Sequence, residues 1–367
     1  MRVKASQLVP GCILLNDVKG KTNRPIMHKN TVLTSEHIVV LERFLVTEVD
    51  VSTKLEAGEL FQPQNNQTQP TQEAQPDISL TKQDSMPFNA HYHLVVNDYQ
   101  SLFSQWQSGI TVDIKKVRML IIPLLERVRE IGTAVFTLHH EATKEAYFYH
   151  HSVAIGMLSA YIGMKMDLPK QEWIQIGLAA FLSDAGMAKI DHSIITKQQT
   201  LTAADMEQVK LHPTYSYRMV KSIPAVTKAI KTTILQHHER EDGSGYPLGL
   251  KGDTIHLYAK IIAVCDTYHA MTCERNYREK QSPFKVIEEL QVEQFTRFDP
   301  AIVHTFIQCL THFSIGMRVR LSDGQTGAIV FIDKQSPTRP IIRLDQNEEL
   351  LKLTDHPSLY ISEISES

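Results

Sequence analysis

The chain has 367 residues, 42% of them hydrophobic and 22% charged, a composition typical of globular proteins with sizeable cores. Its length predicts two or three compact units, and its net charge of −3 provides no basic field to hold a nucleic acid polymer. No stretch reaches the ~18 apolar residues of a membrane span. The four cysteines are far apart and form no CxxC pair, which favours a reduced, cytoplasmic setting.

Residues 1–56 predict a small α/β module. Extended pieces are expected at 12–15, 26–33 and 48–52, with a helix from an N-cap at Thr34-Ser35 to residue 44. Residues 57–87 are predicted to be a flexible Gln- and Pro-rich linker. The stretch FQPQNNQTQPTQEAQP within it has almost nothing apolar to bury and contains three prolines.

Residues 88–312 are predicted to form a helical domain. Apolar residues recur at helical spacing over 112–136, 149–166, 171–185, 203–223 and 225–239. Residues 313–367 contain short β-branched runs broken by Asp323-Gly324 and Ser336-Pro337, which predict a small antiparallel sheet or barrel.

Potential metal ligands occur at intervals along the helical region. They are His151, Asp184, His212, His237, His238 and Asp266. A single helical histidine is more often a core or surface residue than a ligand, so the prediction depends on the whole set. Imidazoles with carboxylates suit a borderline or hard divalent ion. A carboxylate can also bridge two ions about 3.5–4 Å apart for in-line attack on phosphorus.

The sequence HHEREDGSGYPLGLKG, followed by AKIIAVCDTYHAMTCERNYRE, closely resembles the signature of the HD-GYP phosphodiesterases. The segments HHSV and KLHP fall at the family's expected positions upstream, and the match spans roughly residues 150–290. The resemblance implies a bacterial signalling protein that acts on cyclic di-GMP. It also implies a mainly α fold, with an HD-superfamily helical bundle at 88–312 between the small N-terminal α/β module and the small C-terminal β module.

The resemblance also implies a ligand set. His151, Asp184 and Asp266 would serve one metal, and Asp184, as the bridge and central catalytic carboxylate, would serve the second with His212, His237 and His238. The cofactor would be Fe, Mn or Mg, with one or two ions. Some family members are thought to hold a third ion through a glutamate one helical turn before the first histidine. Tyr147 stands at that position here, so at most two are expected.

The motif Gly245-Tyr246-Pro247 names the family. Asp242-Gly243 before it predicts a tight turn, and Tyr246 either contacts the nucleotide or a partner, or only shapes the loop. Arg240, Arg275 and Arg278 offer guanidinium groups for a phosphate or a guanine edge, although surface ion pairs explain arginines as readily.

The chain departs from the family where the family reads His-Asp-Ile-Gly-Lys. The segment here is Ser183-Asp184-Ala185-Gly186-Met187. Ser183 is a weak ligand for a divalent ion, and Met187 cannot offset charge on phosphoryl oxygens in the transition state. Lys189 would replace the missing lysine only if Gly186 ends the helix, and His192 is an alternative ligand.

The expected function is that of a metal-dependent phosphodiesterase hydrolysing cyclic di-GMP to pGpG or GMP, with reduced activity. One alternative is a catalytically impaired cyclic di-GMP sensor, or a docking protein for a diguanylate cyclase or other signalling protein. Another is a phosphohydrolase acting on a different nucleotide. Whether the chain forms a homodimer is left open.

Overall fold

The computed structural model describes the chain except for residues 5–6, 20–24, 35–36, 39–40, 42–45, 47, 57, 59–60, 62–85, 198, 275–279, 311–314, 334–335 and 366–367. It forms two compact units, Met1–Ile78 and Ser79–Ser367. Most of the predicted linker at 57–87 lies outside the described residues. No helix in the described part of the chain is both long enough and apolar enough to cross a membrane.

The first unit contains short antiparallel strand pairs. Strand β1 (Arg2–Lys4) pairs with β4 (Glu48–Asp50), and β2 (Val18–Lys19) pairs with β3 (Pro25–Met27). The expected extended pieces at 12–15 and 26–33 contact each other through an antiparallel bridge between Ile13 and Val32. Most of the expected helix at 35–44 falls outside the described residues.

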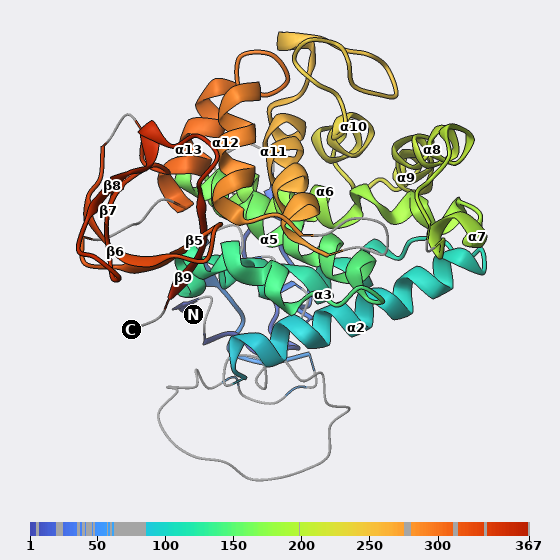
Figure 1. Ribbon diagram of the computed structural model, residues 1–367. Coiled ribbons are helices and arrows are strands. Elements are labelled where there is room, and N and C mark those ends of the chain that lie inside the picture. The colour runs from blue at the N-terminus through green and yellow to red at the C-terminus, as the bar shows by residue number, and fades with distance from the viewer. Residues whose placement is uncertain are drawn as a thin grey trace. The chain divides into compact units, whose positions relative to one another are not determined.

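The second unit is built mainly from helices, which confirms the mainly α fold class (Figure 1). Helix α5 lies at its centre, where every residue from 150 to 163 is buried, and it packs against α6 and α11. The helices are α2 (Phe88–Gln107), α3 (Ile114–Glu126), α4 (Val128–Ile131), α5 (Tyr147–Lys165), α6 (Lys170–Ser183), α7 (His192–Ile195), α8 (Ala203–Val209), α9 (His212–Val220), α10 (Lys228–Gln236), α11 (Leu257–Thr272), α12 (Pro283–Glu293) and α13 (Pro300–Leu310), with the 3₁₀ turns η2 (Gly132–Glu141), η3 (Ala185–Lys189) and η4 (Gly252–Thr254).

The segment 203–223, where apolar residues recur at helical spacing, forms two helices. Helix α8 ends at Val209 and α9 begins at His212. Pro213 explains the break, because proline has no N–H to donate to the carbonyl of Val209 and its ring would clash with that carbonyl. The segment 112–136 is likewise divided into α3, α4 and the start of η2, and α4 ends at Ile131, just before Gly132, whose positive φ of 53° favours glycine.

The C-terminal residues form a five-stranded antiparallel sheet in the order β8, β7, β6, β5, β9, which confirms the antiparallel sheet expected there. Val319 and Leu321 of β5 are buried and alternate with exposed arginines. Phe284 of α12 shares this buried cluster. The strands are β5 (Arg318–Leu321), β6 (Thr326–Phe331), β7 (Ile341–Leu344), β8 (Leu350–Lys352) and β9 (Ile361–Ser365), and the turn η5 (Leu353–Asp355) follows β8.

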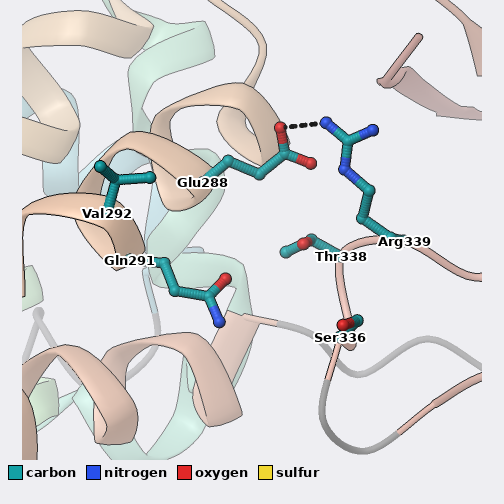
Figure 2. A pocket seen from close by; sticks show the side chains of 6 residues that line it. All are labelled: Glu288, Gln291, Val292, Ser336, Thr338 and Arg339. Atoms are coloured by element: carbon teal, nitrogen blue, oxygen red, sulfur yellow. Dashed lines mark hydrogen bonds and ion pairs between the residues drawn. The ribbon is translucent and has the colours of Figure 1, made fainter. Parts of the chain in front are cut away.

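Arg339 connects this sheet to the helices. Its guanidinium lies 2.7 Å from Glu288 of α12 (Figure 2). It also donates to the carbonyl oxygens of Leu353 and Leu359. A pocket at this junction is lined by Glu288, Gln291, Val292, Ser336, Thr338 and Arg339. None of these residues belongs to the predicted metal ligands, so the pocket is separate from the site described next.

Candidate metal centre

The six predicted ligands come from helices and helix ends that meet at one place. His151 lies on α5, Asp184 follows α6, and His212 begins α9. His237 and His238 follow α10, and Asp266 lies on α11. All except His238 are buried, and the side chains of Asp184, Asp266 and His238 are 11%, 12% and 15% exposed. The structure therefore places together residues that are far apart in sequence.

Asp184 lies between two groups of histidines. Its Oδ1 is 3.1 Å from Nε2 of His212 and 3.7 Å from Nε2 of His237. Its Oδ2 is 3.5 Å from Nε2 of His151. The two oxygens of one carboxylate thus face two sets of imidazoles, which is the geometry that a bridging ligand needs.

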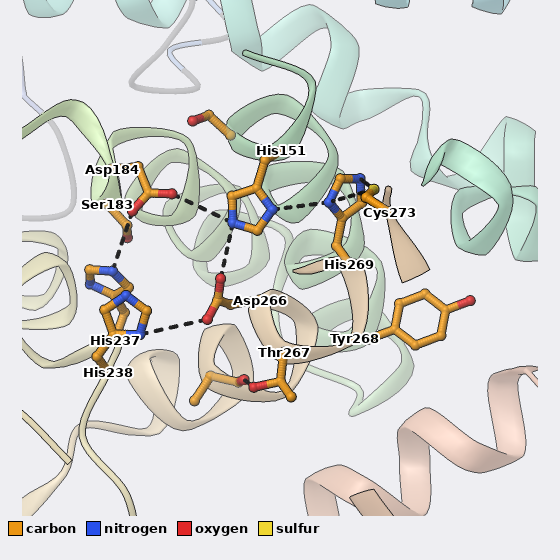
Figure 3. Close-up of polar contacts among 12 residues, drawn as sticks. His151, Ser183, Asp184, His237, His238, Asp266, Thr267, Tyr268, His269 and Cys273 are labelled. Carbon is orange, nitrogen blue, oxygen red and sulfur yellow. Dashed lines mark hydrogen bonds and ion pairs between the residues drawn. The ribbon is translucent and has the colours of Figure 1, made fainter. Parts of the chain in front are cut away.

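Asp266 completes the second side of the site. Its Oδ1 lies 3.0 Å from Nε2 of His151, and its Oδ2 lies 3.6 Å from Nδ1 of His238. Figure 3 shows the His151 ring contacting Asp184 and Asp266 with one nitrogen and His269 with the other. His151 Nε2 therefore faces two carboxylates.

The Nδ1 atoms of His212 and His237 are bound within their own segments. Nδ1 of His212 lies 2.7 Å from the carbonyl oxygen of Val209, which the break at Pro213 leaves without its helical partner. Nδ1 of His237 lies 2.8 Å from the carbonyl oxygen of Ile234 at the end of α10. A carbonyl oxygen only accepts, so each Nδ1 carries the hydrogen, and the Nε2 of a neutral ring presents a lone pair.

These lone pairs converge. Nε2 of His212 and Nε2 of His237 are 3.2 Å apart, and both face the same oxygen of Asp184. One ligand atom from each of Asp184, His212, His237 and His238 lies within 4.8 Å of the others. Buried acceptors without a donor between them are costly, and a divalent cation satisfies all of them at once. These four side chains form a ligand set that fits a metal ion.

Electrostatics favour the ionised carboxylates. Burial opposes the charge on Asp184, and contacts with His212 and His237 as protonated imidazoles would hold the pKa of this carboxyl well below its usual range. Burial likewise opposes the charge on Asp266, while His151 and His238 lower its pKa. Burial holds the pKa of His238 well below that of a free imidazole.

Gly186 allows the Asp184 segment to approach His212. A Cβ at Gly186 would lie 2.2 Å from the carbonyl oxygen of His212 and 2.5 Å from the amide nitrogen of Ser216. The Ser216 hydroxyl donates to the carbonyl of Ser183 at 2.5 Å and accepts the amide hydrogen of Gly186 at 2.7 Å. This contact between η3 and α9 sets the separation of Asp184 and His212.

The Gly245-Tyr246-Pro247 loop packs directly on the His237-His238 segment. A Cβ at Gly245 would lie 2.4 Å from Cα of Glu239, so only glycine fits. The buried Glu239 carboxylate accepts from the amides of Leu248 at 2.7 Å and Leu250 at 2.9 Å. The Tyr246 ring stacks on the His238 ring, with centroids 4.7 Å apart. Tyr246 is therefore held beside a predicted ligand.

Ser183 and the two residues considered as replacements, Lys189 and His192, do not join the histidine cluster. The fully buried Ser183 donates from Oγ to the carbonyl of Ala179 in its own helix, at 2.8 Å. Lys189 Nζ donates to the carbonyl of Trp106 at the end of α2, so it does not replace the missing lysine. His192 is exposed at the start of α7 and is not part of the four-residue cluster.

The three arginines differ in what the structure says of them. Arg240 is buried, its Nη1 donates to the carbonyl of Glu239 at 2.9 Å, and its guanidinium lies 5.2 Å from the centre of the Phe298 ring. These contacts indicate that Arg240 stabilises the turn after His238. Arg275 and Arg278 lie outside the described residues.

Two residues contact Nδ1 of His151, the nitrogen that faces away from the carboxylates. Sequence reasoning missed His269 and named Tyr147 only as the residue in place of a glutamate. Nδ1 of His151 lies 3.0 Å from Nδ1 of His269 and 3.2 Å from the hydroxyl of Tyr147. His269 stands three residues after Asp266 on α11, which places both on one face of the helix. That spacing is the signal that could have identified His269.

A family model described as an HD domain matches residues 138–302. A cyclic di-GMP phosphodiesterase of Pseudomonas aeruginosa, PA4108, is 30% identical over 66% of this chain and 59% of its own length. The cyclic di-GMP phosphodiesterase PdeB of Borreliella burgdorferi is 28% identical over 55% of each chain. The chain thus spans less than two thirds of the length of these relatives.

Among solved structures, an HDG"Y"P protein from Bdellovibrio bacteriovorus, Bd1817, aligns with a TM-score of 0.50 and 13% identity over 84% of this chain and 99% of that chain. At this identity the likeness concerns the fold alone. The HD domain match, the HHER and GYP motifs and the named relatives agree with the helical architecture. Residues 138–302 of the helical domain match the HD domain family model, and the chain is similar to relatives named cyclic di-GMP phosphodiesterases.

Proposed function

We propose that the chain is a metal-dependent phosphodiesterase that hydrolyses cyclic di-GMP with reduced activity. The relatives from Pseudomonas aeruginosa and Borreliella burgdorferi carry the name cyclic di-GMP phosphodiesterase. The observation that carries the proposal is the convergence of His212 Nε2 and His237 Nε2, 3.2 Å apart, on Asp184. Such a set of acceptors is built to hold a cation that can act on phosphorus.

The proposed ligands divide into two groups that share Asp184. His212, His237 and His238 would hold one divalent ion with Asp184. His151 and Asp266 would hold a second, also with Asp184. Fe, Mn or Mg suits imidazole with carboxylate. When bound, these ions supply an activated water and offset charge on the phosphoryl oxygens.

The protein's own groups position these partners. Asp184 would bridge the two groups, since its oxygens face opposite sides. Tyr246, stacked on His238, would contact the nucleotide beside the site. Cleavage of one phosphodiester gives linear pGpG, and cleavage of the second gives GMP. Neither Met187 nor Lys189 provides a cation near the phosphate, a loss commonly worth about 3–4 kcal/mol of transition-state stabilisation.

A second candidate is a catalytically impaired cyclic di-GMP sensor or docking protein. Ser183 bonds to its own helix and Lys189 bonds to the carbonyl of Trp106. Neither replaces the histidine or the lysine that the motif lacks, and this favours the second candidate. A sensor would bind cyclic di-GMP at the same metal centre as the enzyme and would differ from it in turnover.

The test uses the full chain loaded with Mn²⁺ or Fe²⁺ and incubated with cyclic di-GMP, with products separated by chromatography and binding measured by calorimetry. An Asp184→Asn variant serves as the control. Slow formation of pGpG or GMP that Asp184→Asn abolishes supports the enzyme. Binding without products supports the sensor. Hydrolysis of 3'3'-cGAMP but not of cyclic di-GMP would reassign the substrate, since a Vibrio cholerae relative, 28% identical over 43% of this chain, is named for that nucleotide.

A further inference from the structure

His151 differs from the other buried histidines of the site in what its Nδ1 contacts. His212 and His237 stand at helix ends, and a nearby backbone carbonyl accepts from each Nδ1. His151 lies inside α5, where backbone carbonyls are engaged in helical hydrogen bonds. Among the residues that the structure describes, its Nδ1 contacts two side-chain groups, Nδ1 of His269 at 3.0 Å and Oη of Tyr147 at 3.2 Å.

The other nitrogen of His151 fixes where its hydrogen must be. Nε2 lies 3.0 Å from Asp266 and 3.5 Å from Asp184. To bind a cation there, Nε2 must present its lone pair, so a neutral ring carries the hydrogen on Nδ1. That hydrogen needs an acceptor.

His269 is the better placed of the two neighbours. The Tyr147 ring stacks on the His151 ring with 27° between the planes, so its hydroxyl lies toward the face of the imidazole. An imidazole N–H points along the ring plane. The His269 ring lies at the edge of His151, as Figure 3 shows, and its Nδ1 is the nearer atom.

The remaining nitrogen of His269 also has a neighbour. With Nδ1 accepting from His151, Nε2 carries the hydrogen of a neutral His269 ring, and Sγ of Cys273, one turn further along α11, lies 3.5 Å from Nδ1 and 3.6 Å from Nε2. His269 and Cys273 are fully buried. Asp266, His269 and Cys273 are spaced three and four residues apart, so they lie on one face of α11. This face presents Asp266 to Nε2 of His151 and His269 to its Nδ1.

We propose that His269 is a positioning residue that accepts the Nδ1 hydrogen of His151 and thereby directs the His151 Nε2 lone pair toward Asp266 and Asp184. The inference rests on the proposed metal centre. Loss of a residue that orients a ligating histidine typically weakens metal binding by roughly 10–100-fold.

The test measures Mn²⁺ binding to the full, metal-stripped chain without nucleotide, by calorimetry and by electron paramagnetic resonance of free Mn²⁺. The step in the Mn²⁺ titration that a His151→Ala variant loses is the one that belongs to the His151 group. His269→Phe is expected to weaken that step by roughly 10–100-fold and to leave the step of the His212 group unchanged. His269→Asn is expected to restore it, because the Asn Oδ1 lies where Nδ1 of histidine lies and accepts the same hydrogen. Tyr147→Phe is expected to have no effect.

Several results would overturn the assignment. Unchanged binding in His269→Phe would remove any role for His269, and a loss in Tyr147→Phe alone would assign the role to Tyr147. Equal loss of both steps in His269→Phe and in His269→Asn would show that His269 only supports the fold. If the wild-type chain has no step that His151→Ala abolishes, the proposed centre itself fails on that side, and this outcome is separate from the others.

Discussion

His212 and His237 direct their Nε2 atoms toward each other across 3.2 Å, although each ring has its Nδ1 on a carbonyl of its own segment. Two lone pairs that face each other at this distance beside a carboxylate require a positive partner.

Replacing either histidine is expected to empty this half of the centre. His212→Ala or His237→Ala removes a ligand, so we expect the affinity for Mn²⁺ to fall by at least the roughly 10–100-fold that loss of an orienting partner costs. Elemental analysis and Mn²⁺ titration of the purified protein measure this. His192→Ala is the control, since His192 is exposed on α7. Metal content equal to wild type in both ligand variants would refute the assignment.

Gly186→Ala is expected to separate Asp184 from His212. The new Cβ would lie 2.2 Å from a backbone oxygen that no rotamer change can move, so we expect a loss of about 1–3 kcal/mol of unfolding free energy and weaker metal binding. Gly163→Ala is the matched control. Its Cβ would lie 3.0 Å from Ile176 and 3.1 Å from Trp173, both side-chain atoms. This variant therefore tests overpacking away from the metal centre, on α5. Denaturant unfolding and Mn²⁺ titration distinguish the two, and equal metal affinity in both variants would contradict the prediction.

Glu239→Ala is expected to release the Gly245-Tyr246-Pro247 loop. It removes the acceptor for the amides of Leu248 and Leu250, each bond to a charged group being worth about 1.5–3 kcal/mol. We expect weaker cyclic di-GMP binding with metal content retained, measured by calorimetry and elemental analysis. Glu293→Ala, which loses an ion pair with Arg297 on the surface of α12, is the control and should change little. Nucleotide affinity that is unchanged in Glu239→Ala would mean that the loop does not contact the ligand.

Restoring the two missing groups is expected to raise turnover. We expect Ser183→His with Met187→Lys to increase kcat for cyclic di-GMP on the order of 100-fold, with a much smaller change in nucleotide affinity, because the groups act on charge that develops in the transition state. Each single substitution should recover less than the pair. Ser183 is fully buried, so the larger side chain also costs about 1–3 kcal/mol of stability, which thermal unfolding checks.

Lys189→Met is the control for this experiment. Its amine binds the carbonyl of Trp106, so its loss should leave hydrolysis unchanged. If the double variant binds two metals and hydrolyses no faster than wild type, the missing residues do not limit catalysis. The sensor candidate would then be preferred.

The sequence by itself determined the elements and the chemistry of the candidate ligands. Helical periodicity predicted the segments that became α5, α6 and α10, and short β-branched runs predicted the C-terminal sheet. The histidines and carboxylates were candidate metal ligands, and the HHER and GYP motifs carried the resemblance that implied their division between two ions. These features are readable because they depend on residue type and on spacing along the chain.

Only the tertiary structure decided which atoms meet. That Asp184 turns one oxygen to His212 and the other to His151 depends on how α5, α6 and α9 pack. The contact between His151 and His269 joins residues 118 positions apart, and Lys189 reaches Trp106 across 83 positions. Such distances are set by packing, including the close approach at Gly186, and not by any periodicity along the chain.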